Sequence, residues 1–111
     1  RVKPLKGLRA AHSTGNQTVY HPVIAEHPNT KEPVIYVNPG FVSHFENFTA
    51  EESKPRLDSI YKTITKPEYT VKWQPGMTVI WDNAQVLHCA TADYPGHTRT
   101  MYRTVTGRWR P

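Results

Sequence analysis

Residues 99–109 read RTMYRTVTGRW. Side-chain character alternates along this run, which is the pattern of a β-strand, where successive side chains point to opposite faces. The alternation predicts one long strand over these residues. Its two faces carry Arg99, Met101, Arg103 and Val105 on one side and Thr100, Tyr102, Thr104 and Thr106 on the other.

Shorter β-type runs precede this strand, at residues 21–24, 33–38, 69–73 and 77–81. The turn-rich residues 27–31 separate the first two runs and predict a hairpin, and Asn38-Pro39-Gly40 predicts a turn after the second. Pro75-Gly76 separates the last two runs and is placed for a type II turn. Residues 1–20 show turn chemistry at 13–16 without a periodic flank, so they predict a loose lead-in.

One helix is predicted after these first runs. Thr49 and Glu52 have the spacing of a capping box. Pro55 lies near the first turns and is expected to delay the start of the helix, and Lys66-Pro67 is expected to end it. The buried face is predicted to hold Leu57, Ile60, Tyr61 and Ile64.

One helix among about six short strands predicts a mainly β sandwich or barrel. The 111 residues suit one domain, and their 14 Lys+Arg against 9 Asp+Glu give a net charge of +5. A pI of about 9.5 fits an anionic partner, but the lysines are scattered, which favours a solvated basic surface over a nucleic-acid site. A mean hydropathy of −0.65 and a single cysteine argue against a membrane span and an intrachain disulfide. With no apolar run after Arg1, the sequence predicts a cytoplasmic protein.

Arg99 and Arg103 share a strand face with the two most apolar residues of that strand. If this face points inward, each guanidinium needs a negative partner, because an unpaired buried charge is very costly. Positions four apart on a strand lie about 13 Å apart, so the two side chains would hold two different anions, or the two ends of one assembly. Alternatively this face points to solvent and Tyr102 packs inward with the threonines. The strand alone leaves both arrangements open.

His88 follows an apolar strand that ends in Trp81-Asp82-Asn83, and it lies within the apolar run Val-Leu-His-Cys-Ala. A histidine in such surroundings is either a hydrogen-bonded core residue or a ligand. The combination of Trp81-Asp82-Asn83, His88, Arg99 and Arg103 resembles the C-terminal signature of the TauD/TfdA (taurine dioxygenase) family of Fe(II)- and 2-oxoglutarate-dependent dioxygenases. Further stretches agree with this family, in its order, at residues 7–12, 21–23, 27–28, 36–41, 65–69 and 73–76.

The resemblance covers nearly the whole chain and implies a mainly β fold, a double-stranded β-helix (jelly-roll, clavaminate synthase-like) core with one flanking helix. Residues 1–111 are then expected to be the C-terminal part of a single dioxygenase domain. The implied cofactors are Fe(II), the cosubstrate 2-oxoglutarate and O2. The implied reaction oxidises, most commonly hydroxylates, a C–H bond of a small anionic substrate such as a carboxylate or sulfonate, while 2-oxoglutarate becomes succinate and CO2. No nucleic acid or membrane partner is expected, and a homo-oligomer stays open.

The resemblance also assigns roles to five residues. His88 matches the distal iron-ligating histidine, which makes it both a metal ligand and a catalytic residue. Arg99 matches the arginine that clamps the distal carboxylate of 2-oxoglutarate, and Arg103 matches the arginine that binds the acidic end of the substrate. These two roles imply that the strand face with Arg99 and Arg103 points inward. Phe41 matches an aromatic wall of the substrate pocket, and Trp81 matches a tryptophan near the metal.

The sequence departs from the family in two places. A facial triad needs two histidines and one carboxylate, and the family's His-x-Asp/Glu motif has one counterpart here, His44-Phe45-Glu46, in the wrong segment. The other two ligands are therefore expected upstream of residue 1. Residues 13–20 are also shorter than the corresponding family segment. The alternative interpretation is a non-catalytic basic β-sandwich that binds nucleic acid or acidic ligands.

Overall fold

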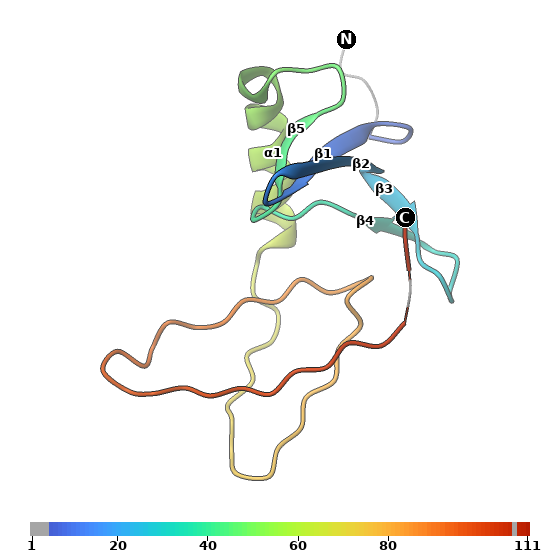
Figure 1. Cartoon of the computed structure of the whole chain (residues 1–111). Coiled ribbons are helices and arrows are strands. Elements are labelled where there is room, and N and C mark those ends of the chain that lie inside the picture. Colours follow the sequence, from blue (N-terminus) through green and yellow to red (C-terminus); the bar gives the residue numbers. More distant parts are fainter. Residues whose placement is uncertain (1–4, 108) are drawn as a thin grey trace.

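The computed structural model of the protein describes residues 5–107 and 109–111, so Arg108 of the predicted last strand lies outside the described residues. Figure 1 shows the strands and the helix together at one end, with the chain after the helix running below them. The elements are, in order, β1 (Arg9–Thr14), β2 (Gln17–Pro22), β3 (Ile24–Glu26), β4 (Pro33–Ile35), β5 (Val42–Phe45) and α1 (Ala50–Ile64).

Three of these strands form an antiparallel sheet in the order β2-β1-β5. β1 and β2 form a hairpin that pairs Ala10 with His21, and Gly15 at its tip has a φ of 60°. The predicted loose lead-in is therefore wrong from residue 9 on, although the turn chemistry within it is correctly placed, and its first four residues lie outside the described part of the chain. The strand was missed because its buried residues are the alanines Ala10 and Ala11, and alanine is depleted in strands.

The predicted hairpin around residues 27–31 is confirmed. β3 and β4 pair antiparallel, with Ile24 opposite Ile35. The first arm is Ile24–Glu26 rather than residues 21–24, because residues 21 and 22 belong to β2, and the second arm ends at Ile35 rather than Asn38. The backbone N–H of Tyr36 donates to the Val23 carbonyl at 2.7 Å and so continues the contact between the two arms. The predicted turn after this run is also present, since the N–H of Phe41 donates to the Asn38 carbonyl at 3.1 Å.

The capping box of α1 forms as predicted. The Thr49 hydroxyl accepts the Glu52 N–H at 3.1 Å, and the Glu52 carboxylate accepts the Thr49 N–H at 2.8 Å. The helix begins at Ala50, so the predicted delay at Pro55 is wrong. A proline here removes one intrahelical hydrogen bond, and the box and the buried face outweigh that loss. The helix ends before Lys66-Pro67, as predicted.

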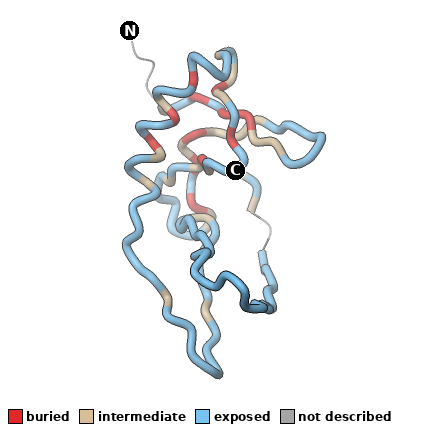
Figure 2. The backbone as a smooth tube through the Cα atoms, turned by 90° about the vertical axis from the view of Figure 1, so that its left-hand side faces the viewer, coloured by how far each residue is buried: buried red, intermediate tan, exposed pale blue. Residues whose placement is uncertain are grey.

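The hydrophobic core lies between α1 and the sheet. Figure 2 shows the buried residues gathered at this end of the molecule. The Ser53 hydroxyl ties the helix to β5 by accepting the Phe45 N–H at 2.9 Å, and it donates to the Thr49 carbonyl at 2.8 Å. The core residues are Leu8, Ala10, Val23, Val37, Val42, Phe45, Leu57 and Ile60. The predicted buried face of the helix is thus confirmed, with Tyr61 and Ile64 at its margin.

The chain after α1 forms turns but no paired strands in the described residues. The type II turn is present, because Gly76 has a φ of 81° and the Met77 N–H donates to the Gln74 carbonyl at 3.2 Å. The predicted strands over 69–73, 77–81 and, as far as it is described, 99–109 have no ladder partner within 5–107 and 109–111. A β-strand needs hydrogen bonds to a neighbouring strand, whereas a turn forms its hydrogen bond within its own four residues. In the same described part of the chain, no helix is long and apolar enough to cross a membrane.

The fold class is nevertheless the expected one. The described structure is mainly β with a single helix.

Candidate active site

Trp81 and His88 lie together on either side of one turn. Their ring centroids are 4.7 Å apart and the ring planes are tilted by 47°. The turn between them is closed by Asp82, whose carbonyl accepts the N–H groups of Gln85 at 3.2 Å and Val86 at 2.9 Å. The Trp81 indole N–H donates to the Asn83 side chain at 2.7 Å. Of the five predicted site residues, the structure brings these two into contact.

Asp82 connects this turn to the β3–β4 hairpin. Its Oδ2 accepts a hydrogen bond from Nε2 of His27 at 2.7 Å, and its Oδ1 accepts the Ala84 N–H at 2.9 Å. The bond from His27, followed by that from Ala84, holds the pKa of the Asp82 carboxyl below its usual value. His27 is 3% exposed, so its ring is withdrawn from water by the hairpin around it.

The hydrogen bond between His27 and Asp82 was not predicted from the sequence, which placed His27 in a turn and in a stretch that resembles the family, without a role. A usable signal was present. His27 begins a tight turn whose next N–H groups can reach its ring, and Asp82 comes directly after an apolar run. A pairing across 55 positions, however, depends on where the two segments meet, which local pattern does not encode.

Arg99 and Arg103 are both exposed, and so are Met101 and Val105, which are 47% and 64% exposed. The expected inward orientation of this face is therefore not found. The alternative with Tyr102 packed inward is not found either, because Tyr102 is 97% exposed. No second sheet covers this run in the described chain, so neither face is buried.

The guanidinium of Arg99 lies over the ring of Tyr94, 5.4 Å from its centroid. Within residues 5–107 and 109–111, no carboxylate forms an ion pair with Arg99 or Arg103. Both charges are accordingly unneutralised by the part of the chain that the structure describes. Planar guanidinium groups in this state suit bidentate binding of carboxylate, sulfonate or phosphate ligands.

Phe41 lies on the turn before β5, where its carbonyl accepts the Ser13 N–H at 2.9 Å and its side chain is 51% exposed. No ring contact joins it to Trp81 or His88 among the described residues. Phe41, the predicted aromatic wall, therefore lies on the turn before β5 and does not contact Trp81 or His88.

The described residues do not complete an iron site. They contain no group of three His, Cys, Asp or Glu side chains that could hold a metal ion. His88 is exposed and offers one nitrogen ligand. The His44-Phe45-Glu46 motif is engaged elsewhere, since His44 bonds to Tyr20 at 3.3 Å and Glu46 pairs with Arg9 at 3.4 Å. These contacts agree with the expectation that this motif does not bind iron.

A cluster of rings on the first sheet was also missed. His12 stacks on Tyr36 with centroids 5.2 Å apart and meets His21 edge-on at 5.0 Å. Burial, and then the neighbouring His21, lower the pKa of His12. The end of the chain returns to this cluster, because Trp109 packs against Tyr36 at 5.2 Å and the Pro111 oxygen accepts a bond from His21 Nδ1 at 3.1 Å.

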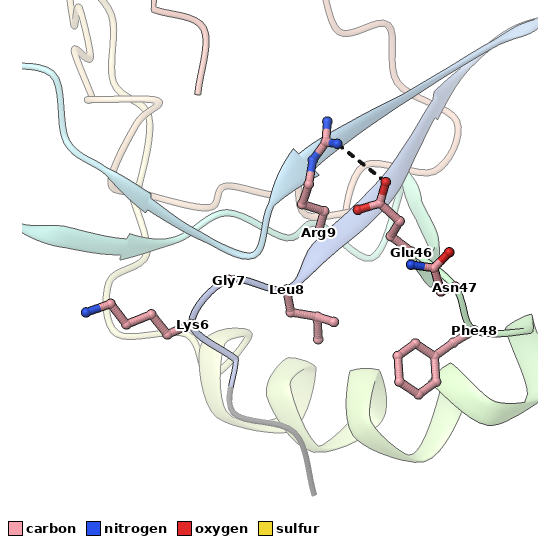
Figure 3. Close-up of a pocket in the computed structure, with 7 residues that line it drawn as sticks. All are labelled: Lys6, Gly7, Leu8, Arg9, Glu46, Asn47 and Phe48. Atoms are coloured by element: carbon pink, nitrogen blue, oxygen red, sulfur yellow. Dashed lines mark hydrogen bonds and ion pairs between the residues drawn. The ribbon is translucent and has the colours of Figure 1, made fainter.

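A hollow of about 240 Å³ lies beside the start of β1, and Figure 3 shows the Arg9–Glu46 ion pair across its upper side. Leu8 and Phe48 form its apolar part and Lys6 extends away from it (Figure 3). None of the five predicted site residues lines this hollow. It is therefore distinct from the turn that carries Trp81 and His88.

Comparison with known proteins gives one family. Residues 6–105 match the family described as taurine catabolism dioxygenase TauD, TfdA. An alkylsulfatase from Acinetobacter baylyi is 33% identical over 106 residues, which cover 93% of this chain and 33% of that protein. An alpha-ketoglutarate-dependent (2-oxoglutarate-dependent) sulfonate dioxygenase from Saccharomyces cerevisiae is 32% identical over 99 residues, covering 85% of this chain and 24% of that protein.

A solved structure agrees with these relatives. The crystal structure of a taurine dioxygenase from Burkholderia xenovorans is 38% identical, with a TM-score of 0.54 over 61% of this chain and 26% of that chain. The chain therefore spans about a third or less of the length of the proteins that it matches.

Proposed function

Because the chain belongs to the taurine catabolism dioxygenase TauD, TfdA family, we propose that it acts in the 2-oxoglutarate-dependent oxidation of a C–H bond in a small anionic substrate. The observation that carries this proposal is the family match over residues 6–105, which includes all five predicted site residues. In the overall reaction, one oxygen atom of O2 enters the substrate as a hydroxyl group. The other enters succinate as 2-oxoglutarate loses CO2.

The family implies iron, 2-oxoglutarate and O2 as the reacting set. His88 is proposed as one iron ligand, with Trp81 beside it at 4.7 Å. The described residues do not by themselves supply the remaining ligands. This chain's own contribution to the chemistry is therefore proposed to be the binding and orientation of the anionic ligands.

Arg99 is proposed to hold the distal carboxylate of 2-oxoglutarate, and Arg103 the acidic group of the substrate. Both side chains are exposed and unpaired with carboxylates in the described chain, so both are available to ligand anions. A guanidinium group fixes a planar carboxylate, or two oxygens of a sulfonate, through parallel hydrogen bonds. Such fixing determines which C–H bond lies closest to the oxidant.

The substrate class is proposed from the relatives together with Arg103. One relative is named as a sulfonate dioxygenase and another as an alkylsulfatase. A sulfonate or sulfate ester therefore heads the substrates to be tested, ahead of carboxylates. Phe41 is proposed to contact the apolar part of the substrate. A cytoplasmic location stays a prediction from the sequence.

The proposal is tested by anaerobic titration of the intact protein with Fe(II) and 2-oxoglutarate. We expect a weak visible charge-transfer band in the wild type and its loss in His88→Ala. An intact protein that shows no band and consumes no 2-oxoglutarate would contradict the proposed activity. DNA binding that weakens steeply with salt would instead favour the basic binding module.

A further inference from the structure

We propose that His27 is a positioning residue, whose hydrogen bond to Asp82 fixes the turn over residues 82–86 and thereby the location of His88. The inference rests on the proposed function insofar as His88 is an iron ligand. It adds a residue 61 positions away in the sequence, to which neither the sequence motifs nor the family match assigns a role.

The hairpin turn determines which ring nitrogen of His27 carries the proton. Its Nδ1 accepts two backbone N–H groups, from Asn29 at 3.2 Å and from Thr30 at 3.1 Å. A ring nitrogen that accepts hydrogen bonds carries no proton, so the proton of the neutral ring is on Nε2. Nε2 is the atom that faces Asp82, at 2.7 Å. The hairpin turn thus selects the tautomer that donates to the carboxylate.

The His27 donor is also held rigidly. His27 is 3% exposed, and its own N–H donates to the Glu32 carbonyl at 2.9 Å while its carbonyl accepts the Lys31 N–H at 3.1 Å. Backbone and ring are therefore both held by the β3–β4 hairpin. A donor held in this way has little freedom to lose when it binds Asp82, so it can serve as a fixed reference point.

Asp82 in turn fixes the backbone of the turn that follows it. One carboxylate oxygen binds His27, the other binds the Ala84 N–H, and the backbone carbonyl accepts the N–H groups of Gln85 and Val86. The whole turn is thus built on one residue. His88 comes two residues after Val86, and its ring rests 4.7 Å from that of Trp81, the residue before Asp82. The backbone that leads to His88 and the Trp81 ring that His88 contacts therefore both depend on where Asp82 is held.

Residues that hold a metal ligand through an intermediate hydrogen bond typically change metal affinity by 10- to 100-fold when mutated. His27 and Asp82 act on His88 through the backbone of a turn. An effect at the lower end of that range is therefore expected.

Two substitutions of His27 separate its two tasks. In His27→Asn the side-chain oxygen can replace Nδ1 as acceptor for the turn, but the side chain is too short to reach Asp82. In His27→Gln the amide N–H group can reach Asp82, but the oxygen no longer serves the turn. Asp82→Asn is the complementary variant. Its side chain is half-exposed, so the substitution is tolerated by the fold, and an amide can satisfy either the His27 or the Ala84 donor but not both.

The experiment compares the intact wild type with these three variants. The first readout is amide hydrogen exchange at Ala84, Gln85 and Val86, and the second is the dissociation constant for Fe(II) alone under anaerobic conditions. We expect His27→Asn and Asp82→Asn to speed exchange at these three amides and to weaken Fe(II) binding by roughly 10-fold. His27→Gln is expected to stay within about 3-fold of the wild type in both readouts, with exchange in α1 unchanged throughout.

The inference is overturned if His27→Asn exchanges and binds Fe(II) as the wild type does, or if His27→Asn and His27→Gln lose equally. The second result would mean that burial or the turn, and not the bond to Asp82, is what matters. If the wild type binds neither Fe(II) nor 2-oxoglutarate, the proposed function fails. The exchange comparison then decides by itself whether His27 positions the segment.

Discussion

Ser53 Oγ accepts the backbone N–H of Phe45 at 2.9 Å, in a place where both residues are withdrawn from water. β5 ends at Phe45, so this bond satisfies a backbone donor at the point where the strand leaves the sheet and turns towards the helix. The same hydroxyl donates to the Thr49 carbonyl in the first turn of α1. One side chain thus joins the sheet to the helix inside the core.

Replacing Ser53 with alanine is expected to destabilise the protein by about 1–3 kcal/mol, because the buried Phe45 N–H loses its acceptor. The free energy of unfolding is measured by urea denaturation. Ser59→Ala, on an exposed position of the same helix, is the matched control and should change stability by less than about 0.5 kcal/mol. Equal midpoints for Ser53→Ala and the wild type would show that the bond contributes nothing.

Thr49→Ala removes the hydroxyl that accepts the Glu52 N–H at the start of α1. The expected cost is about 1 kcal/mol, which is typical for the loss of an N-cap. Thr49→Ser keeps the hydroxyl and should retain most of the stability. Thermal unfolding of the two variants, beside the exposed Thr63→Ala, measures the difference. A loss in Thr63→Ala as large as that in Thr49→Ala would argue against a capping effect.

The stability of the protein is expected to fall in acid through Asp82. The hydrogen bond from His27 lowers the pKa of Asp82 in the folded state, so the unfolded chain binds the proton more readily. Its stabilising contribution is therefore complete above the unfolded value, near 3.8, and is lost as the pH falls through the lower folded pKa. Denaturation between pH 6 and pH 2.5 measures this slope. Asp82→Asn should flatten it, and an unchanged slope would contradict the assignment.

Arg99→Ala and Arg103→Ala are expected to affect different ligands. Each substitution removes a charged hydrogen-bond donor worth about 1.5–3 kcal/mol, or roughly 10- to 100-fold in affinity. Arg99→Ala should raise the KM for 2-oxoglutarate, and Arg103→Ala should raise the KM for an alkyl sulfonate. Steady-state kinetics of the intact protein, with each ligand varied in turn, provides the test. Equal, mild effects on both ligands would contradict the two roles.

The features that were predictable from the sequence are those specified by neighbouring residues. The Thr49 and Glu52 pair predicted the helix start, and Pro75-Gly76 predicted the type II turn. Each motif forms its own hydrogen bonds within four residues, so no distant partner is needed. The β3–β4 hairpin was likewise visible from the turn residues between two β-type runs. In each case the physical cause lies inside the motif.

Features that depend on distant partners were less predictable. The alternation of side-chain character over residues 99–107 indicates that this segment can form a strand. A strand ladder, however, needs a second strand, and the described residues supply none. The bond between His27 and Asp82 joins segments 55 positions apart, so neither segment signals it alone. Of the candidate site, the contact between Trp81 and His88 lies within one motif, whereas the relation of that motif to Arg99, Arg103 and Phe41 depends on long-range packing.

The extended course of residues 69–107 also bears on how the protein behaves when it is concentrated. Its backbone is described with hydrogen bonds only inside its own turns, and it exposes large apolar side chains such as Ile80, at 91%, and Tyr102, at 97%. Extended chain segments with unpaired backbone groups and apolar side chains can pair edge to edge with another copy. Precipitation on concentration is accordingly expected to begin in this segment, so a charged substitution at Ile80 or Tyr102 is where solubility should be gained first.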